Sequence, residues 1–224
     1  PPRSTLFPYT TLFRSGSVDV SQITEDVANS LFASASGLPP GKGETTPSPD
    51  KSGAYTWLKA PRYNGNVMEV GPLARMLVAY GAGDAIVKQA VDDALAKLGR
   101  PSEGLNSVMG RHLVRALECK IVADRREAWA NEFQLGKPCC KDFELPSEGC
   151  GYGLVEAPRG ALGHWMSISE KRIAGYQWVV PTTWNCSPRD DKGTPGVIEQ
   201  ALVGTPVADE SHCAERGHRG GACR

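Results

Sequence analysis

Residues 152–180 carry the pattern that most constrains how this chain can fold. Three short runs rich in aromatic and β-branched residues follow one another there: 152–157, 161–168 and 173–180. A proline-arginine-glycine step separates the first two runs, and a polar turn at 169–172 separates the last two. Apolar runs bounded by turn residues in this way are typical of adjacent strands. The sequence therefore predicts a small three-stranded antiparallel sheet.

The turn between the first two runs places an arginine between a proline and a glycine. Pro158 fixes its own backbone and Gly160 can adopt angles closed to other residues, so Arg159 is expected to project from a rigid corner. A guanidinium stays charged and presents a planar fork of donors, which suits an anionic or metal-bound ligand in a partly dry site. The same pattern also fits a structural arginine that binds carbonyl oxygens across the hairpin.

Apolar residues at helical spacing predict helices upstream of the sheet. A short one is expected after a cap at Ser21, with Ile23, Val27 and Leu31 on one side, and a loop dense in Gly, Pro, Ser and Thr follows over 37–53. Two further helices are expected, one from about 68 to 80 with Pro72 in its first turn, and one over 85–98 that stops at Gly99.

The longest helix is expected over about 105–132. Its apolar residues form a broad stripe that should be buried against neighbouring elements. Arg111, Arg115 and Glu118 lie among them and fit ordinary surface or interhelix ion pairs. A last short helix is expected over 194–203. Thr194 would cap it and Pro195 would take its first position. These elements predict an α+β fold that is mainly α, a helix bundle with the small three-stranded antiparallel sheet.

Composition narrows the class of protein. The chain has 25 basic and 25 acidic residues, so its zero formal charge gives no electrostatic case for binding nucleic acid. No stretch approaches the ~18 to 20 consecutive apolar residues of a membrane span. Any membrane association is therefore expected to come indirectly, through a partner subunit.

Several ordered motifs resemble the carboxy-terminal half of the large subunit of nickel-iron hydrogenases. The resemblance is carried by these segments: 55–63, 68–75, 156–165, 179–185 and 187–190. Long, separate motifs in a fixed order are far more specific than one short pattern. The resemblance covers about residues 18–209, and it implies that the predicted elements are part of a larger large-subunit fold.

The resemblance implies an enzyme that cleaves H2 heterolytically and reversibly. The reaction would take place at a nickel-iron centre with cyanide and carbon monoxide ligands, and the electrons would pass to an iron-sulfur small subunit. Arg159 matches the catalytic arginine of the family, which leans over the metals. Pro158, Pro181 and Thr182 match neighbours of the pocket for the diatomic ligands. Trp178 matches a residue whose backbone carbonyl binds a magnesium ion, with its ring expected in the core.

The family's metal-binding cysteines do not occur in this sequence. They form two pairs of Cys-x-x-Cys type, whereas the first cysteine here is Cys119 and none of the seven has that spacing. A nickel-iron site needs soft thiolates, so the chain as written lacks the nickel and iron ligands and is expected to be an inactive fragment. Cys139, Cys140 and Cys150 flank a polar loop and are expected to be free or structural thiols.

Both ends of the sequence depart from the family pattern. Residues 1–16 read as the translation of a sequencing adapter, and residues 211–224 turn abruptly to His, Cys, Arg and Gly, as a frameshift would produce. Residues 17–210 are then expected to form a single partial domain of the large subunit.

Two other functions remain open from the sequence. One is a metal-free hydrogenase-like scaffold subunit of a quinone-reducing respiratory complex, although such subunits lose the Pro-Arg-Gly and Pro-Thr-Thr-Trp-Asn elements retained here. The other is a helical interaction module without chemistry. Residues 59–62 and 68–75 resemble the respiratory uptake class most, which implies a periplasmic enzyme associated with the membrane through its partner subunits.

Overall fold

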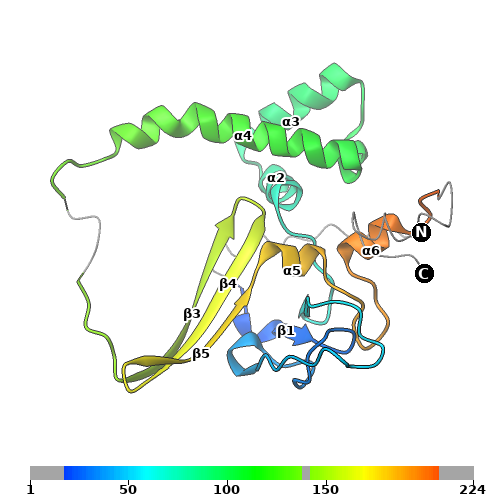
Figure 1. Ribbon diagram of the computed structural model, residues 1–224. Coiled ribbons are helices and arrows are strands. Elements are labelled where there is room, and N and C mark those ends of the chain that lie inside the picture. The colour runs from blue at the N-terminus through cyan, green and yellow to red at the C-terminus, as the bar shows by residue number, and fades with distance from the viewer. Residues whose placement is uncertain (1–17, 138–141, 207–224) are drawn as a thin grey trace.

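The computed structural model describes residues 18–137 and 142–206 (Figure 1). The expected adapter segment 1–16, the tail 211–224 and the pair Cys139 and Cys140 lie outside these residues. The elements follow in this order: η1 Val20–Gln22, β1 Ile23–Asp26, η2 Pro40–Lys42, β2 Ala60–Tyr63, α2 Pro72–Gly81, α3 Ala85–Leu98, η3 Ser102–Asn106, α4 Val108–Asn131, β3 Glu148–Ala157, β4 Gly160–Ser169, β5 Arg172–Val179, α5 Pro181–Asn185 and α6 Val197–Leu202. The predicted class, α+β with a small three-stranded sheet, is confirmed.

The predicted sheet forms with the order β3-β4-β5, and both pairs are antiparallel. Ala157 pairs with Gly160 at the tip of the first hairpin, and Ser169 pairs with Arg172 at the second turn. Glu170 and Lys171 adopt positive φ angles of 51° and 61° there, which lets the chain reverse within two residues. The hairpin tip points toward the helices in Figure 1.

The helices α2, α3 and α4 pack together around one apolar cluster: Leu73, Met76, Val87, Val91, Leu95, Leu105 and Val114. The predicted bounds of α3 are confirmed because both ends carry strong local signals. Asp84 accepts hydrogen bonds from the amides of Ile86 and Val87, and Gly99 adopts the left-handed conformation after the last turn. Among the helices that the structure describes, none is both long and apolar enough to cross a bilayer.

The expected burial of the whole apolar stripe on α4 is wrong. On this helix only Gly110 and Val114 are buried, and Ala128 of the expected stripe, in the carboxy-terminal half, is exposed. The cause is a mismatch in length, because α4 has 24 residues while α2 and α3 have 10 and 14. Figure 1 shows the carboxy-terminal half of α4 extending past both of its neighbours.

The helix expected after Ser21 does not form. A 3-10 turn, η1, leads into β1, which pairs antiparallel with β2 in the register Ile23 to Tyr63 and Asp26 to Ala60. The helical spacing of the apolar residues was coincidental, since a strand about 40 positions further along supplies the hydrogen-bonding partner. Tertiary pairing of this kind overrides local propensity.

A second apolar cluster joins the sheet to the rest of the molecule. Its buried members come from β1, β4, β5, α5 and the segment before α2: Ile23, Met68, Val70, Ala161, Trp165, Val179 and Trp184. The start of β4 and the end of β5 are therefore packed on one face against α5 and the residues that lead into α2.

A buried ion pair fixes the segment that follows α5. The Arg62 guanidinium on β2 donates to the Asp190 carboxylate at 2.9 Å, and its remaining N–H groups bind the Ser187 hydroxyl and the carbonyls of Pro61, Pro188 and Thr194. The Asp190 carboxylate also accepts the amide of Thr194 at 2.9 Å.

The predicted start of the last helix is wrong, because residues 190–194 form a turn around the Asp190 carboxylate. Thr194 is held by Asp190 rather than capping a helix, so α6 begins at Val197 with Gly196 as its cap. Pro195 therefore lies before the helix and not at its first position. The error of two to three positions arises because the carboxylate that captures Thr194 is itself fixed by β2.

The Asp190 ion pair predicts acid sensitivity. Burial raises the pKa of Asp190, but the Thr194 amide and Arg62 outweigh this effect, and its pKa lies below the ordinary value. The pair therefore stabilises the fold above about pH 4, and this contribution is lost as the pH falls through the lowered pKa. At pH 7 we expect Asp190→Asn to reduce the free energy of unfolding by about 3 kcal/mol, because Arg62 is left buried with a neutral partner.

Urea unfolding at a series of pH values measures this effect. The difference between the wild type and Asp190→Asn should shrink on acidification. A matched control is Asp124→Asn, which removes an exposed carboxylate that pairs with Lys120 one helical turn away. A difference that grows toward low pH would contradict the assigned role of Asp190.

Candidate functional site around the Arg159 corner

Arg159 lies at the tip of the β3–β4 hairpin, in the two-residue turn with Pro158. Both residues are exposed. Within residues 18–137 and 142–206, no group forms a hydrogen bond or ion pair with the Arg159 side chain. Its position is therefore set entirely by the backbone that carries it. The predicted corner is present at this turn, and residues of α2 and the segment before α2 contact it.

Arg75 of α2 binds the carbonyl groups that lead into this corner. Its guanidinium donates to the carbonyl oxygens of Ala157 at 2.9 Å and Pro158 at 2.8 Å. It also donates to the Glu156 carboxylate at 2.9 Å. The two remaining N–H groups form a bidentate pair with Glu118 of α4, at 2.6 and 2.7 Å. Every guanidinium N–H thus has an acceptor, as a buried arginine requires.

The other side of the corner packs directly against the segment before α2. Gly160 has a φ of 137°, and a Cβ there would lie 2.6 Å from a methyl carbon of Val70 and 2.8 Å from the Gly71 amide nitrogen. Gly71 has a φ of 119°, and its Cβ would lie 2.7 Å from the Arg159 carbonyl oxygen. Both positions require glycine, because of the backbone angle and because the two chains touch.

The same segment is bound to α5 by a side-chain amide. The Val70 amide donates to the Asn185 carbonyl oxygen, and the Asn185 amide group donates to the Val70 carbonyl, both at 2.9 Å. The pairing resembles two rungs of a strand ladder. It fixes α5, with Pro181 at its first position, to the residues on which the Arg159 corner rests. Of the predicted site residues in α5, Pro181 is buried and Thr182 is exposed.

The structure thus brings the predicted site residues onto two neighbouring segments. Pro158 and Arg159 lie on the hairpin corner, Pro181 and Thr182 lie at the start of α5, and residues 70–71 connect the two through the contacts above. The remaining predicted residue, Trp178, lies on β5, paired with His164 of β4.

The expected burial of the Trp178 ring is wrong. The residue is 59% exposed, because neighbouring strand residues face opposite sides of the sheet and Val179 faces the core. The ring lies edge-on to Tyr176 and His164 at centroid distances of 5.7 and 6.5 Å. His164 shares a 2.6 Å hydrogen bond with the Tyr176 hydroxyl, as expected for a structural histidine.

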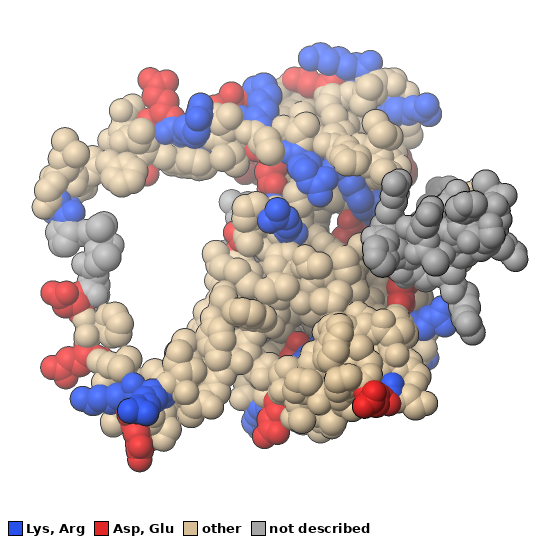
Figure 2. Space-filling model, in the orientation of Figure 1, with Lys and Arg blue, Asp and Glu red and all other residues tan. Residues whose placement is uncertain are grey.

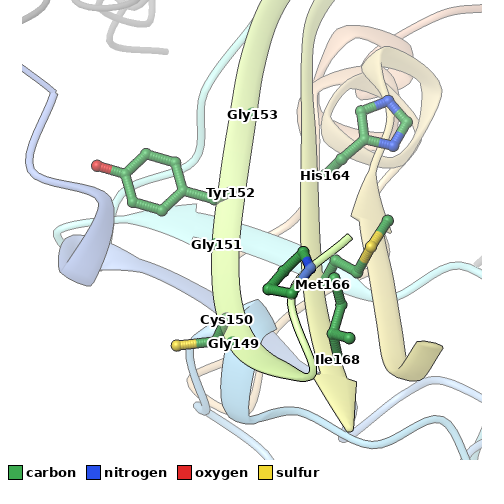
Figure 3. Close-up of a pocket in the computed structure, with 9 residues that line it drawn as sticks. Gly149, Cys150, Gly151, Tyr152, Gly153, His164, Met166 and Ile168 are labelled. Atoms are coloured by element: carbon green, nitrogen blue, oxygen red, sulfur yellow. The ribbon is translucent and has the colours of Figure 1, made fainter. Parts of the chain in front are cut away.

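The open face of the sheet is hollowed along β3. A pocket of about 360 Å³ lies there, and its lining combines a proline, backbone glycines and apolar side chains: Pro146, Gly149, Cys150, Gly151, Tyr152, Gly153, His164, Met166 and Ile168. Figure 3 shows Met166, Ile168 and His164 on one side of the hairpin and Cys150 and Tyr152 on the other. No acid, lysine or arginine lines the pocket, and its titratable lining residues are Cys150, Tyr152 and His164.

The described residues do not fit a nickel-iron centre. The three described cysteines, Cys119, Cys150 and Cys186, lie on different elements, and no cluster of three potential metal ligands occurs in the part of the chain that the structure describes. Burial raises the pKa of the Cys186 thiol, which disfavours the thiolate that a metal would need. The donors for such a centre would have to come from elsewhere in a larger protein.

A family model described as nickel-dependent hydrogenase matches residues 5–216, and the chain belongs to this family. The sequence is 41% identical over 197 residues to the periplasmic [NiFeSe] hydrogenase large subunit of Desulfomicrobium baculatum, a match that covers 85% of this chain and 38% of that one. It is 45% identical over 164 residues to the hydrogenase-1 large chain of Escherichia coli strain K12, covering 69% of this chain and 28% of that one.

A solved structure of the Ni-Fe-Se hydrogenase from D. vulgaris Hildenborough in the reduced state matches with a TM-score of 0.75 at 38% identity. This match covers 86% of this chain and 41% of that chain. These results confirm the resemblance that the motifs indicated. The chain spans about two fifths of the length of the D. baculatum and D. vulgaris proteins.

The roles of Arg75, Gly71 and Asn185 were not predicted. All three lie inside the motif segments 68–75 and 179–185, which marked them as part of the resemblance without assigning contacts. A glycine directly before a helical Pro72 was the one local signal of a special backbone position. The contacts themselves join residues that lie far apart in sequence, 82 positions for Arg75 and Ala157.

The close packing at the corner gives a stability prediction. We expect Gly160→Ala to reduce the free energy of unfolding by about 3 kcal/mol, because the added methyl meets Val70 and the Gly71 backbone at a φ that alanine rarely adopts. Gly65→Ala is a matched control, since Gly65 has a φ of 72° but no atom within 4 Å. That change should cost about 1 kcal/mol, the price of the backbone angle alone.

Chemical denaturation of both variants gives the comparison. Equal losses for Gly160→Ala and Gly65→Ala would show that the contact with residues 70–71 is unimportant.

Proposed function

We propose that this chain is the carboxy-terminal part of a hydrogenase large subunit, and that the complete enzyme cleaves H2 heterolytically and reversibly. The observation that supports this most strongly is the family match over 5–216, together with the retained Pro-Arg-Gly and Pro-Thr-Thr corners on adjoining segments. A nickel-iron centre with cyanide and carbon monoxide ligands would supply the redox chemistry. Its metal ligands would come from parts of the large subunit outside the described residues.

In this proposal Arg159 supplies a fixed cation and a fork of hydrogen-bond donors at the reaction site. Its side chain has no competing acceptor in the described part of the chain, so its donors are available to an anionic ligand. Pro158 and Pro181 would shape the pocket for the diatomic ligands, and the exposed Thr182 hydroxyl would be a further donor. Donors fixed in a dry cavity act strongly because nothing has to reorganise during the reaction.

We further propose that the backbone carbonyl of Trp178 binds a magnesium ion. A carbonyl oxygen is a hard ligand of the kind that magnesium prefers. The exposed ring takes no part in this role, so its position on the open face is compatible with it.

Exposed apolar side chains support the proposal that residues 17–210 are one part of a larger body. Phe133 and Leu135 lie between α4 and residue 137, and Phe143 lies just after residue 142, where the description resumes. All three are exposed, Leu135 by 98%. Figure 2 shows the molecule hollowed between α4, residues 142–147 and the sheet. We propose that these exposed apolar side chains contact the remainder of the large subunit.

We propose an iron-sulfur small subunit as the partner that receives the electrons. We also propose a periplasmic location, which the likeness to the D. baculatum protein supports because its name gives that location. Association with the membrane would then be indirect, through partner subunits.

Sequencing the gene beyond both ends of the present chain tests the proposed function. Two Cys-x-x-Cys pairs in one open reading frame, one on each side, are expected. An intact frame without them would support the metal-free scaffold subunit instead, because such a chain could not bind nickel and iron through thiolates.

The role of Arg159 is tested by Arg159→Lys in the complete large subunit, assembled with its partner. Lysine keeps the charge but loses the planar fork, and we expect about a 100-fold to 1000-fold loss of H2 oxidation with unchanged nickel content. The control is Arg172→Lys, an exposed change at the far end of the sheet, which should leave the activity unchanged. Normal turnover in Arg159→Lys with normal nickel content would refute the role.

A further inference from the structure

We propose that Arg75 is the positioning residue for Arg159, and that Glu118 of α4 sets the orientation of Arg75. This inference rests on the proposed function of Arg159, but its central claim concerns the corner itself. Arg75 touches neither the Arg159 side chain nor any reacting atom. It acts on the backbone from which Arg159 projects.

The hydrogen bonds of Arg75 reach the two peptide carbonyls immediately before Arg159. These are the Ala157 carbonyl at 2.9 Å and the Pro158 carbonyl at 2.8 Å. Pro158 lies in the two-residue turn, where its carbonyl has no place in the strand ladder, and Ala157 is the last residue of β3. One planar group satisfies both, so the guanidinium fixes the direction in which the chain enters the corner.

Glu118 and Glu156 hold the guanidinium itself in place. Glu118 accepts its Nε–H and one terminal N–H in a bidentate pair at 2.6 and 2.7 Å, and Glu156 accepts another at 2.9 Å. The Arg75 side chain is only 10% exposed. Burial opposes its charge, but the two carboxylates outweigh burial, and the pKa of Arg75 lies above its ordinary value. Arg75 is therefore a permanent cation at this position.

The corner is thus fixed from two sides. Arg75 holds the residues before Arg159, and the contact of Gly160 with residues 70–71 holds the residue after it. Because Arg159 has no side-chain partner of its own in the described residues, a shift of the corner carries its guanidinium along. A displacement of about 1 Å at a reacting centre can cost about 100-fold in rate.

The test uses Arg75→Lys in the complete large subunit assembled with its partner. Lysine keeps the charge and can pair with one carboxylate, but a single ammonium cannot bind Glu118 and both carbonyls in this geometry. Peptide-level hydrogen exchange over residues 155–161 should become at least tenfold faster. The turnover of H2 should fall at least tenfold, with the nickel content unchanged.

Arg111→Lys is the matched control. Arg111 forms a bidentate pair with Glu69 at 2.8 and 2.7 Å, so the change also removes a paired guanidinium between α4 and the α2 region. Arg111 donates to no carbonyl of the corner. Exchange over 155–161 should therefore stay within twofold of the wild type. Unchanged exchange in Arg75→Lys, or equal acceleration in both variants, would overturn the proposal.

A double-mutant cycle shows whether Arg75 acts through Arg159. In the Arg159→Lys background, adding Arg75→Lys should lower turnover by less than twofold further, because the group being positioned has already lost its fork. Losses that multiply in the double variant would overturn the proposal. If Arg159→Lys alone leaves turnover unchanged, the proposed function of Arg159 fails, and the exchange measurement still decides whether Arg75 holds the corner.

Glu118→Gln covers the case in which Arg75→Lys does not assemble. It keeps the size of the side chain and weakens the bidentate pair that orients Arg75. The exchange of 155–161 should accelerate at least threefold, in the same direction as for Arg75→Lys. Exchange at the wild-type rate would overturn the role assigned to Glu118 and, with it, the proposal.

Discussion

The contact of residues 70–71 with their two neighbours is the constraint on which the arrangement of the candidate site depends. Gly71 and Gly160 let two backbones touch, and Asn185 binds both polar groups of Val70. In these contacts the hairpin corner and α5 do not bind each other directly. Each is located against the same two residues, so one short extended segment sets the geometry between them. Val70 contributes its buried side chain and both backbone polar groups to this arrangement, and Gly71 contributes the space that lets the hairpin approach.

Two arginines whose side chains are at most 10% exposed bind the carbonyl groups of irregular chain segments. Arg62 donates hydrogen bonds to carbonyl oxygens around the turn at Asp190, and Arg75 donates to carbonyl oxygens at the hairpin tip. Both have every N–H bound, which compensates the cost of removing a charge from water. Irregular backbone that leaves its carbonyls unpaired needs such donors when it is buried. In this protein, arginine side chains supply the hydrogen-bond donors that a strand ladder or a helix would supply elsewhere.

Local signals made part of the fold predictable. The helix α3 was predicted to the residue from its apolar spacing and the stop at Gly99, and the structure adds Asp84 as the cap at its start. The three strands followed from runs bounded by tight turns. The strand β1 was missed because its partner β2 lies far along the chain and the apolar spacing imitated a helix. The corner itself was predicted from Pro158 and Gly160, whereas Arg75 binds it over 82 positions and Asn185 binds α5 to Val70 over 115 positions. Sequence spacing carries no information on such distant contacts.

The glycines of β3 leave one end of the hairpin with few side-chain contacts. Gly149, Gly151 and Gly153 have open space where side chains would be, and the first six residues of β3 are all exposed. That half of the hairpin is joined by its ladder and little else, so it will open at a low free energy. The opposite end is anchored by α2 and the core. The hairpin is therefore held more firmly at its tip than at its base, the reverse of an ordinary surface loop.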